Sequence, residues 1–265
     1  MSTGVRTYSR LIKDYFLLNL SAAMEYRISF ITQTAGMALN NAFFVFFWWI
    51  IFRNTGSIGS YTFSDVMVIW AVVASAFGFA FILFGNARNI TNLIMQGGLD
   101  VYLLQPKNVL INVVCSATNV SAWGDFLYGF ILFFIVFGID PGRFLLFILF
   151  IITGGLFITS ILVIVHSLTF YMGNATGIAN SVFEFLIAFS LYPEDIFRGY
   201  VRLFMYSVIP VGFISFLPHK VMKFLDWRIF LLVLAVSIVY FAVAWFIFFR
   251  GLKKYESGNL IAGRM

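Results

Sequence analysis

Apolar residues gather in long runs along this chain, and shorter stretches that carry the charges separate these runs. A helix needs about 20 mostly apolar residues to cross the hydrocarbon core of a bilayer. Six segments reach or approach this length, and we interpret each as a transmembrane helix. They are residues 28–52, 66–84, 109–139, 144–172, 175–192 and 229–249. The third is long enough to tilt or to begin outside the bilayer, whereas the fifth is barely long enough to span it.

Two further segments mix apolar and charged residues. Residues 1–27 have a helix-compatible pattern, and we expect them to form an interfacial helix lying on the membrane. Residues 193–228 contain an apolar core, 203–217, that is too short to span. Pro193 and Pro218 bracket this core, which suits an outer-leaflet re-entrant segment that enters and leaves on one side. Two short helices lying flat among the headgroups suit the pattern equally well.

Composition supports a membrane protein. Hydrophobic residues make up 62% of the 265 residues, charged residues only 11%, and the mean hydropathy is +0.96. Soluble domains carry about 25% charged residues. The sequence therefore predicts an all-α polytopic membrane protein with a single transmembrane domain over residues 1–265. The first 27 residues lack the short apolar core and small-residue cleavage site of a secretory signal, so no cleavable signal peptide is expected.

The basic balance of the chain bears on its orientation. The formal net charge is +6, which in a membrane protein reflects orientation and lipid headgroup contact rather than nucleic-acid binding. With six spans both termini share one side, and that side would hold ten of the 17 Lys and Arg residues. Five of the other seven belong to residues 193–228. We therefore predict that both termini are cytoplasmic.

Nothing in the sequence indicates catalysis on this chain. Cys115 is the single cysteine, which excludes an internal disulfide. His166 and His219 lie far apart, with no cysteine or carboxylate at ligand spacing, so no metal site is predicted. The phosphate-binding pattern G-x-x-x-x-G-K-[ST] is absent, so the chain is not expected to hydrolyse nucleotide by that route.

The stretch NLIMQGGLDVYLLQPKN, residues 92–108, lies between the second and third predicted spans. Its glycine pair is expected to break the preceding helix, and a short helix is expected to start at Leu99. Asp100 would occupy the first turn, where the helix dipole favours a negative charge, and Pro106 would end the helix. Leu99, Tyr102 and Leu103 fall at helical spacing and predict one apolar face. Such a helix suits docking into a groove of a partner protein, although a loop resting on the membrane fits as well.

The order of these elements resembles the permease subunit of a type-2 ABC exporter, and three stretches carry the resemblance. GGLDVYLLQPKN is similar to the coupling stretch of that family. YPEDIFRGYVRLFMYSVIPVGFISFLPHKVM and GLKKYESGN are similar to the segment before the last span and to the tail of one uncharacterised bacterial branch. The coupling residues that the resemblance implies are Gly97, Gly98, Leu99, Asp100, Tyr102, Leu103, Leu104 and Pro106. Gly98 departs from the family, because relatives often have Glu there.

The resemblance implies an efflux system of the bacterial inner membrane. Two permeases, identical or diverged, would each bear one ATPase subunit, and ATP and Mg²⁺ would bind only to those partners. The short helix at 99–104 would sit in a groove of the ATPase and transmit its closure, and the interfacial helix would contact the same subunit. The branch often pairs two different permeases, which favours a heterodimeric core. Drug, lipid, peptide and glycoconjugate cargoes all fit.

Several polar groups fall inside the predicted spans. A charge at the bilayer centre costs at least about 2.5 kcal/mol, so each should face protein or water. They either line a pathway or fasten helices together. For Asp125 and His166 we favour fastening, while for Glu184 both readings stay open, since the resemblance places the second and fifth spans near the dimer axis. Asn40 and Asn41 are further pathway candidates, although interhelical hydrogen bonds suit them better.

Two other classes of protein fit parts of the pattern. An ion-coupled carrier or channel without an ATPase would use Asp125 and Glu184 to move charge. A membrane scaffold that transports nothing is the third interpretation, and it leaves the 92–108 stretch without a purpose. Gly78, Gly85 and Gly177 are candidates for close helix approach, with no individual assignment.

Overall fold

The computed structural model describes residues 2–256, with side chains from residue 7 onward. Within this range most residues are helical and no β-strand occurs, so the predicted all-α class is confirmed. The loop before the third helix holds one isolated bridge between Ile58 and Tyr61. Arg264 and residues 257–259 of the GLKKYESGN stretch lie outside the described residues.

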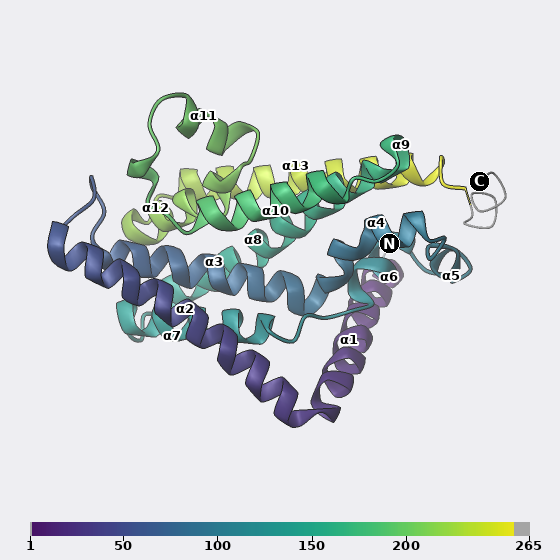
Figure 1. The fold of residues 1–265 in the computed structure, drawn as a ribbon, viewed down its shortest axis with the longest axis horizontal. Coiled ribbons are helices and arrows are strands. Elements are labelled where there is room, and N and C mark those ends of the chain that lie inside the picture. Colours follow the sequence, from purple (N-terminus) through teal and green to yellow (C-terminus); the bar gives the residue numbers. More distant parts are fainter. Residues whose placement is uncertain (1, 257–265) are drawn as a thin grey trace.

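Most of the helices run side by side along the long axis of the molecule (Figure 1). In chain order they are α1 (Ser2–Glu25), α2 (Arg27–Thr55), α3 (Phe63–Phe84), η1 (Gly85–Asn89), α4 (Ile90–Met95), α5 (Asp100–Leu103), α6 (Val109–Cys115), α7 (Ala122–Phe137), α8 (Pro141–Ser167), α9 (Thr169–Met172), α10 (Thr176–Ser190), η2 (Glu194–Ile196), α11 (Tyr200–Ser207), η3 (Val211–Phe213), α12 (Phe216–Phe224) and α13 (Trp227–Leu252). The start of α1 and the end of α13 lie at one end, and α11 and α12 lie at the other.

Four helices in the described residues are long and apolar enough to cross a membrane. They are Arg27–Thr55, Phe63–Met95, Pro141–Met172 and Trp227–Leu252, and the bent pair of α11 with Val211–Phe224 makes a fifth if it counts as one span. The helices α7 and α10 are apolar but have only 16 and 15 residues. At about 1.5 Å per residue they are shorter than the ~30 Å hydrocarbon core. Length and composition therefore give four to five candidate spans.

The predicted continuous helix over 109–139 is wrong, because residues 116–121 separate α6 from α7. Polar side chains from elsewhere in the chain satisfy the carbonyl groups that this break exposes. Asn86 donates to the Val113 carbonyl at 3.0 Å, and Asn19 donates to the Cys115 carbonyl at 2.9 Å. A helix end inside an apolar protein needs such partners, and here they come from η1 and α1.

The segment 193–228 contains a bent pair of short helices, a form that fits both a re-entrant segment and two short helices among the headgroups. The axis turns by 68° between α11 and Val211–Phe224. Pro210 lies at the bend, where its missing N–H and fixed φ prevent a continuous helix. This pair covers one end of the helix bundle in Figure 1.

The helix α3 is the centre of the bundle. Within the span Phe63–Met95, which begins with α3, 83% of the most apolar window is buried, as expected for a helix surrounded by others. Only 17% of the corresponding windows of α2 and α13 is buried. Those two helices therefore present broad apolar faces to whatever surrounds the chain.

Candidate functional site

The predicted coupling stretch folds into one helical turn, α5, and its apolar residues point in opposite directions. Leu99 is fully buried, and the Tyr102 hydroxyl donates to the Ser116 Oγ at 3.0 Å. Leu104 is 88% exposed, and Val101 and Leu103 are exposed as well. The predicted docking face of Leu99, Tyr102 and Leu103 therefore needs correction: the first two anchor the turn, and Val101, Leu103 and Leu104 form its exposed apolar tip. We call these three residues the α5 tip.

Glycine and a helix cap hold the α5 tip in place. Gly97 has φ +74°, a left-handed conformation that favours glycine, and it turns the chain after α4. A Cβ at Gly98 would lie 2.9 Å from the flexible end of the Leu93 side chain. After the turn, the Asn108 side chain accepts a hydrogen bond from the Ile111 N–H at 3.1 Å and caps α6. Both ends of the stretch are thus fixed by local geometry.

The helices α1 and α13 reach the same corner of the molecule. The Tyr15 hydroxyl of α1 donates to Asn112 Oδ1 of α6 at 3.4 Å. Tyr255, just after α13, lies beside Asp100, and burial together with this carboxylate raises the pKa of the tyrosine to about 12. The helix α1, the α5 turn and the end of α13 therefore lie together beside α6.

Two of the three predicted intramembrane ionisable groups fasten helices together. The Asn41 amide of α2 donates to Asp125 Oδ1 of α7 at 2.7 Å, and both side chains are buried. The Thr91 hydroxyl lies 2.8 Å from His166 Nδ1 and 2.9 Å from the Thr169 hydroxyl, which joins α4 to α8 and α9. Each of these polar groups has a partner within the chain, as the cost of burying it requires.

Glu184 and Asn40 are exposed, in contrast to Asp125 and His166. Each belongs to a stripe of exposed polar or small residues at helical spacing. On α2 the stripe consists of Ser29, Gln33, Gly36 and Asn40, and on α10 it consists of Gly177, Asn180, Ser181 and Glu184. Such stripes are costly against lipid, because hydrocarbon offers no hydrogen-bond partners. Both faces are therefore expected to be covered by protein or water in the membrane.

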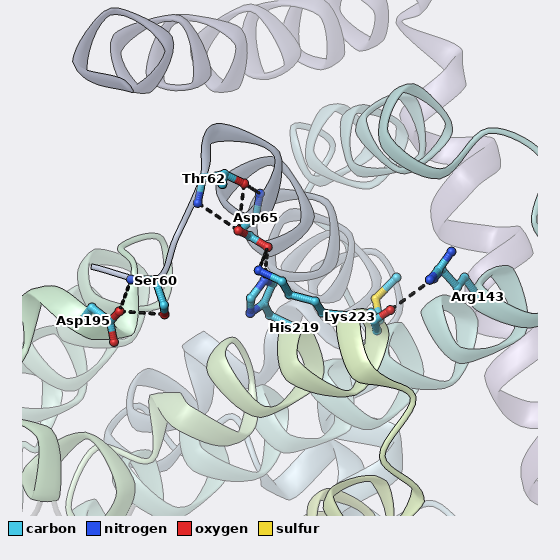
Figure 2. A network of polar contacts seen from close by, with 8 residues as sticks. Ser60, Thr62, Asp65, Arg143, Asp195, His219 and Lys223 are labelled. Carbon is cyan, nitrogen blue, oxygen red and sulfur yellow. Dashed lines mark hydrogen bonds and ion pairs between the residues drawn. The ribbon is translucent and has the colours of Figure 1, made fainter. Parts of the chain in front are cut away.

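A polar network at the other end of the bundle ties α12 to the start of α3 (Figure 2). Asp65 closes a capping box with Thr62 at the beginning of α3. The other oxygen of this carboxylate, Oδ1, lies 3.0 Å from His219 Nε2 and 2.8 Å from Lys223 Nζ. Nearby, Asp195 accepts hydrogen bonds from the backbone N–H and the hydroxyl of Ser60, and the backbone bond is the main reason that the pKa of Asp195 is lowered.

A third acid, Glu194, holds the bent pair together from inside. It is only 1% exposed and forms ion pairs with Arg202 of α11 and, at 2.6 Å, with Lys220 of α12. The Tyr206 hydroxyl donates to the same carboxylate at 2.8 Å. Sequence reasoning missed Asp65 and Glu194, because Asp65 and His219 are 154 residues apart and no local pattern pairs them. The only signal in the sequence was the position of these acids, since Asp65 lies near a helix start and Glu194 follows Pro193.

In the part of the chain that the structure describes, no three His, Cys, Asp or Glu side chains are placed to hold a metal ion. What the geometry defines is a multi-pass helical membrane protein with an exposed apolar knob at the end where α1 begins and α13 ends. The sequence profile of the ABC-2 family transporter proteins matches residues 38–259, and the chain belongs to this family. It is therefore a membrane permease of an ABC transporter. Permeases of this family are not themselves catalytic, and they generally work with a partner ATPase subunit. A comparison with curated proteins found no match.

Proposed function

We propose that this permease forms one half of the translocation pathway of an ATP-driven exporter, and that a separate ATPase subunit moves it by docking on the α5 tip. The observation that carries the proposal is the exposure of Leu104, at 88%, on a turn whose other side is anchored by buried Leu99. An exposed apolar knob on a fixed base suits a groove in a partner protein. ATP and Mg²⁺ would bind to that partner and not to this chain.

The proposed topology has six crossings, with both termini in the cytoplasm of a bacterial cell and the chain in its inner membrane. Four crossings use the long helices, and the other two use α6 with α7, and α10. An even number of crossings agrees with the position of the start of α1 and the end of α13 at one end of the molecule (Figure 1). The α5 tip lies at that same end. The bent pair of α11 and α12 then occupies the outer side.

The proposed complex contains two permeases and two ATPase subunits. The polar stripes of α2 and α10 support a second permease, because a protein surface or a hydrated pathway would cover groups such as Glu184 that lipid would penalise. A diverged second permease, giving a heterodimeric core, remains our preference from the resemblance. Drug, lipid, peptide and glycoconjugate cargoes all remain compatible with this pathway.

Replacing Val101 and Leu104 together by Asp is expected to leave the permease folded in the membrane and to detach its ATPase. Two charges in an apolar docking groove would cost several kcal/mol, so recovery of the ATPase should fall more than about tenfold. The measurement is a mild-detergent pull-down of the tagged chain, with the partner identified by mass and ATP hydrolysis assayed in the eluate. Ile139→Asp is the matched control, since Ile139 is 94% exposed but lies between α7 and α8. An unchanged complex in the double variant would refute docking at the α5 tip.

Replacing Glu184 by Gln distinguishes the exporter from an ion-coupled carrier. In an exporter the amide keeps the polarity of the α10 stripe, so ATP-dependent transport should persist within about tenfold, as expected for loss of one charge in a hydrated region. In a carrier the same change would remove the titrating group and abolish pH-dependent flux. The measurement is transport in membrane vesicles with and without ATP and across a pH gradient. Asn180→Asp makes the reverse change, because it adds a negative charge to the same stripe.

A further inference from the structure

An apolar cavity of about 350 Å³ lies between α8 and α13. Its walls come from five helices, α1, α3, α6, α8 and α13, and include Ile12, Leu110, Leu156, Val163, Leu234 and Trp245. On its open side Ile238 and Phe241 are exposed, so the cavity communicates with the surface of the bundle. The volume falls within the range of small-molecule pockets. None of its walls belongs to α2 or α10, so a second permease on the polar stripes would leave the cavity facing lipid.

The hydroxyl groups in the cavity wall are already engaged within their own helices. Thr159 donates to the Gly155 carbonyl at 2.8 Å, and Ser160 donates to the Leu156 carbonyl at 2.7 Å. On the opposite wall Ser237 donates to the Val233 carbonyl at 2.8 Å. Apart from the indole N–H of Trp245, these bonds leave no side-chain donor hydrogen for a ligand, so the cavity presents a largely hydrocarbon surface. A polar drug or a sugar would lose its hydration there without compensation.

Two exposed lysines lie close in sequence to residues of the α1 and α6 walls of the cavity. Lys13 follows Ile12 directly on α1, and Lys107 lies three residues before Leu110 of α6. One acid, Asp14, accompanies them on α1. Lysines at the border of an apolar surface extend to the headgroup layer and attract anionic lipid. The cavity thus combines a hydrocarbon interior with a basic rim at the side of the chain termini.

We infer that this cavity binds one acyl chain of an anionic membrane phospholipid, whose headgroup contacts Lys13 and Lys107. The site is a lipid-binding site on the outer surface of the permease, separate from the proposed pathway between two permeases. It requires only that α8 and α13 lie in the membrane, so it does not depend on docking of an ATPase at the α5 tip. An acyl chain there would fill the gap between α1, α8 and α13 and join these helices.

The test uses the full chain in phosphatidylcholine vesicles that contain increasing fractions of phosphatidylglycerol with brominated acyl chains. Bromine quenches tryptophan fluorescence on contact, and the contribution of Trp245 is isolated by subtracting the signal of Trp245→Phe. Quenching of Trp245 is expected to saturate at a low fraction of brominated lipid. Quenching of Trp227, which is 65% exposed at the start of α13 and isolated with Trp227→Phe, should follow the bulk lipid fraction.

Two kinds of variant separate the interior of the site from its rim. Ser160→Leu and Ala244→Leu each fill the cavity and should remove the saturable quenching while the chain stays folded. Lys13→Gln with Lys107→Gln should reduce the preference for phosphatidylglycerol over brominated phosphatidylcholine by about fivefold per lysine. Quenching of Trp245 that rises in proportion to bulk lipid in the unaltered chain would overturn the inference. Protection of Trp245 at every lipid fraction would overturn it too, because a second protein chain would then cover the cavity.

Discussion

Replacing Gly129 by Ala is expected to lower the free energy of unfolding by about 1–3 kcal/mol, the usual range for overpacking a tight contact. A Cβ at this position would meet the Ser75 Oγ and would lie 2.5 Å from the Ala71 carbonyl oxygen. Both belong to α3, which is surrounded by other helices and has little room to move. The added methyl group therefore forces α7 away from the central helix of the bundle.

Gly36→Ala is the matched control for this change. Gly36 also lies inside a helix, but an added Cβ there meets nothing within 4 Å. Alanine is favoured over glycine in a helix by about 1 kcal/mol, so helix propensity stabilises both variants equally. The difference between them, measured by denaturant titration of the detergent-solubilised chain, reports the packing at Gly129 alone. Equal stability of the two variants would contradict a close α3–α7 contact.

The glycines illustrate how far the sequence can predict packing. Gly78, Gly85 and Gly177 were equal candidates for close helix approach. The structure places Gly78 against the backbone of Phe126 and Gly85 against residues 117–119, while a Cβ at Gly177 would meet nothing within 4 Å. Gly129 also makes a close contact, although the sequence offers no special sign of it. Small residues permit close approach, but only the fold decides which of them is used.

The long spans were predictable because hydrophobicity acts on a whole helix at once. The helices α2, α3, α8 and α13 all begin and end within a few residues of the apolar runs, or extend beyond them. The break after Cys115 was not predictable, since its carbonyl groups are satisfied by Asn19 and Asn86 from distant parts of the chain. A local apolar run cannot reveal such long-range hydrogen bonds.

The coupling stretch shows a similar limit on a smaller scale. The sequence identified a short turn bounded by glycine and proline, and α5 occupies that place. It could not tell which side of a single turn faces the protein, because one turn carries too few residues to define a face. The burial of Leu99 and the hydrogen bond of Tyr102 decide the matter, and they transfer the proposed docking role to the α5 tip.

Replacing Glu194 by Gln is expected to destabilise the bent pair by about 3 kcal/mol, because removing one partner of a buried ion pair leaves the others uncompensated. Lys220 and Arg202 both depend on this carboxylate, which is 1% exposed. Their own exposure, 30% and 48%, gives them partial hydration and places the cost at the lower end of the range for buried pairs. Tyr206 would lose the charged acceptor of its hydrogen bond as well.

Asp140→Asn is the control that separates burial from charge in this comparison. Asp140 pairs with Arg143 at 3.0 Å, but both side chains are about one-third exposed. A solvent-screened pair contributes little to stability, and the amide can still cap α8, so this variant should remain close to the unaltered chain. Denaturant titration of both variants in the same detergent measures the difference. If Glu194→Gln were as stable as Asp140→Asn, the two cations would be finding other partners, and the bent pair would be held by its apolar contacts with α8 and α13 rather than by the buried acid.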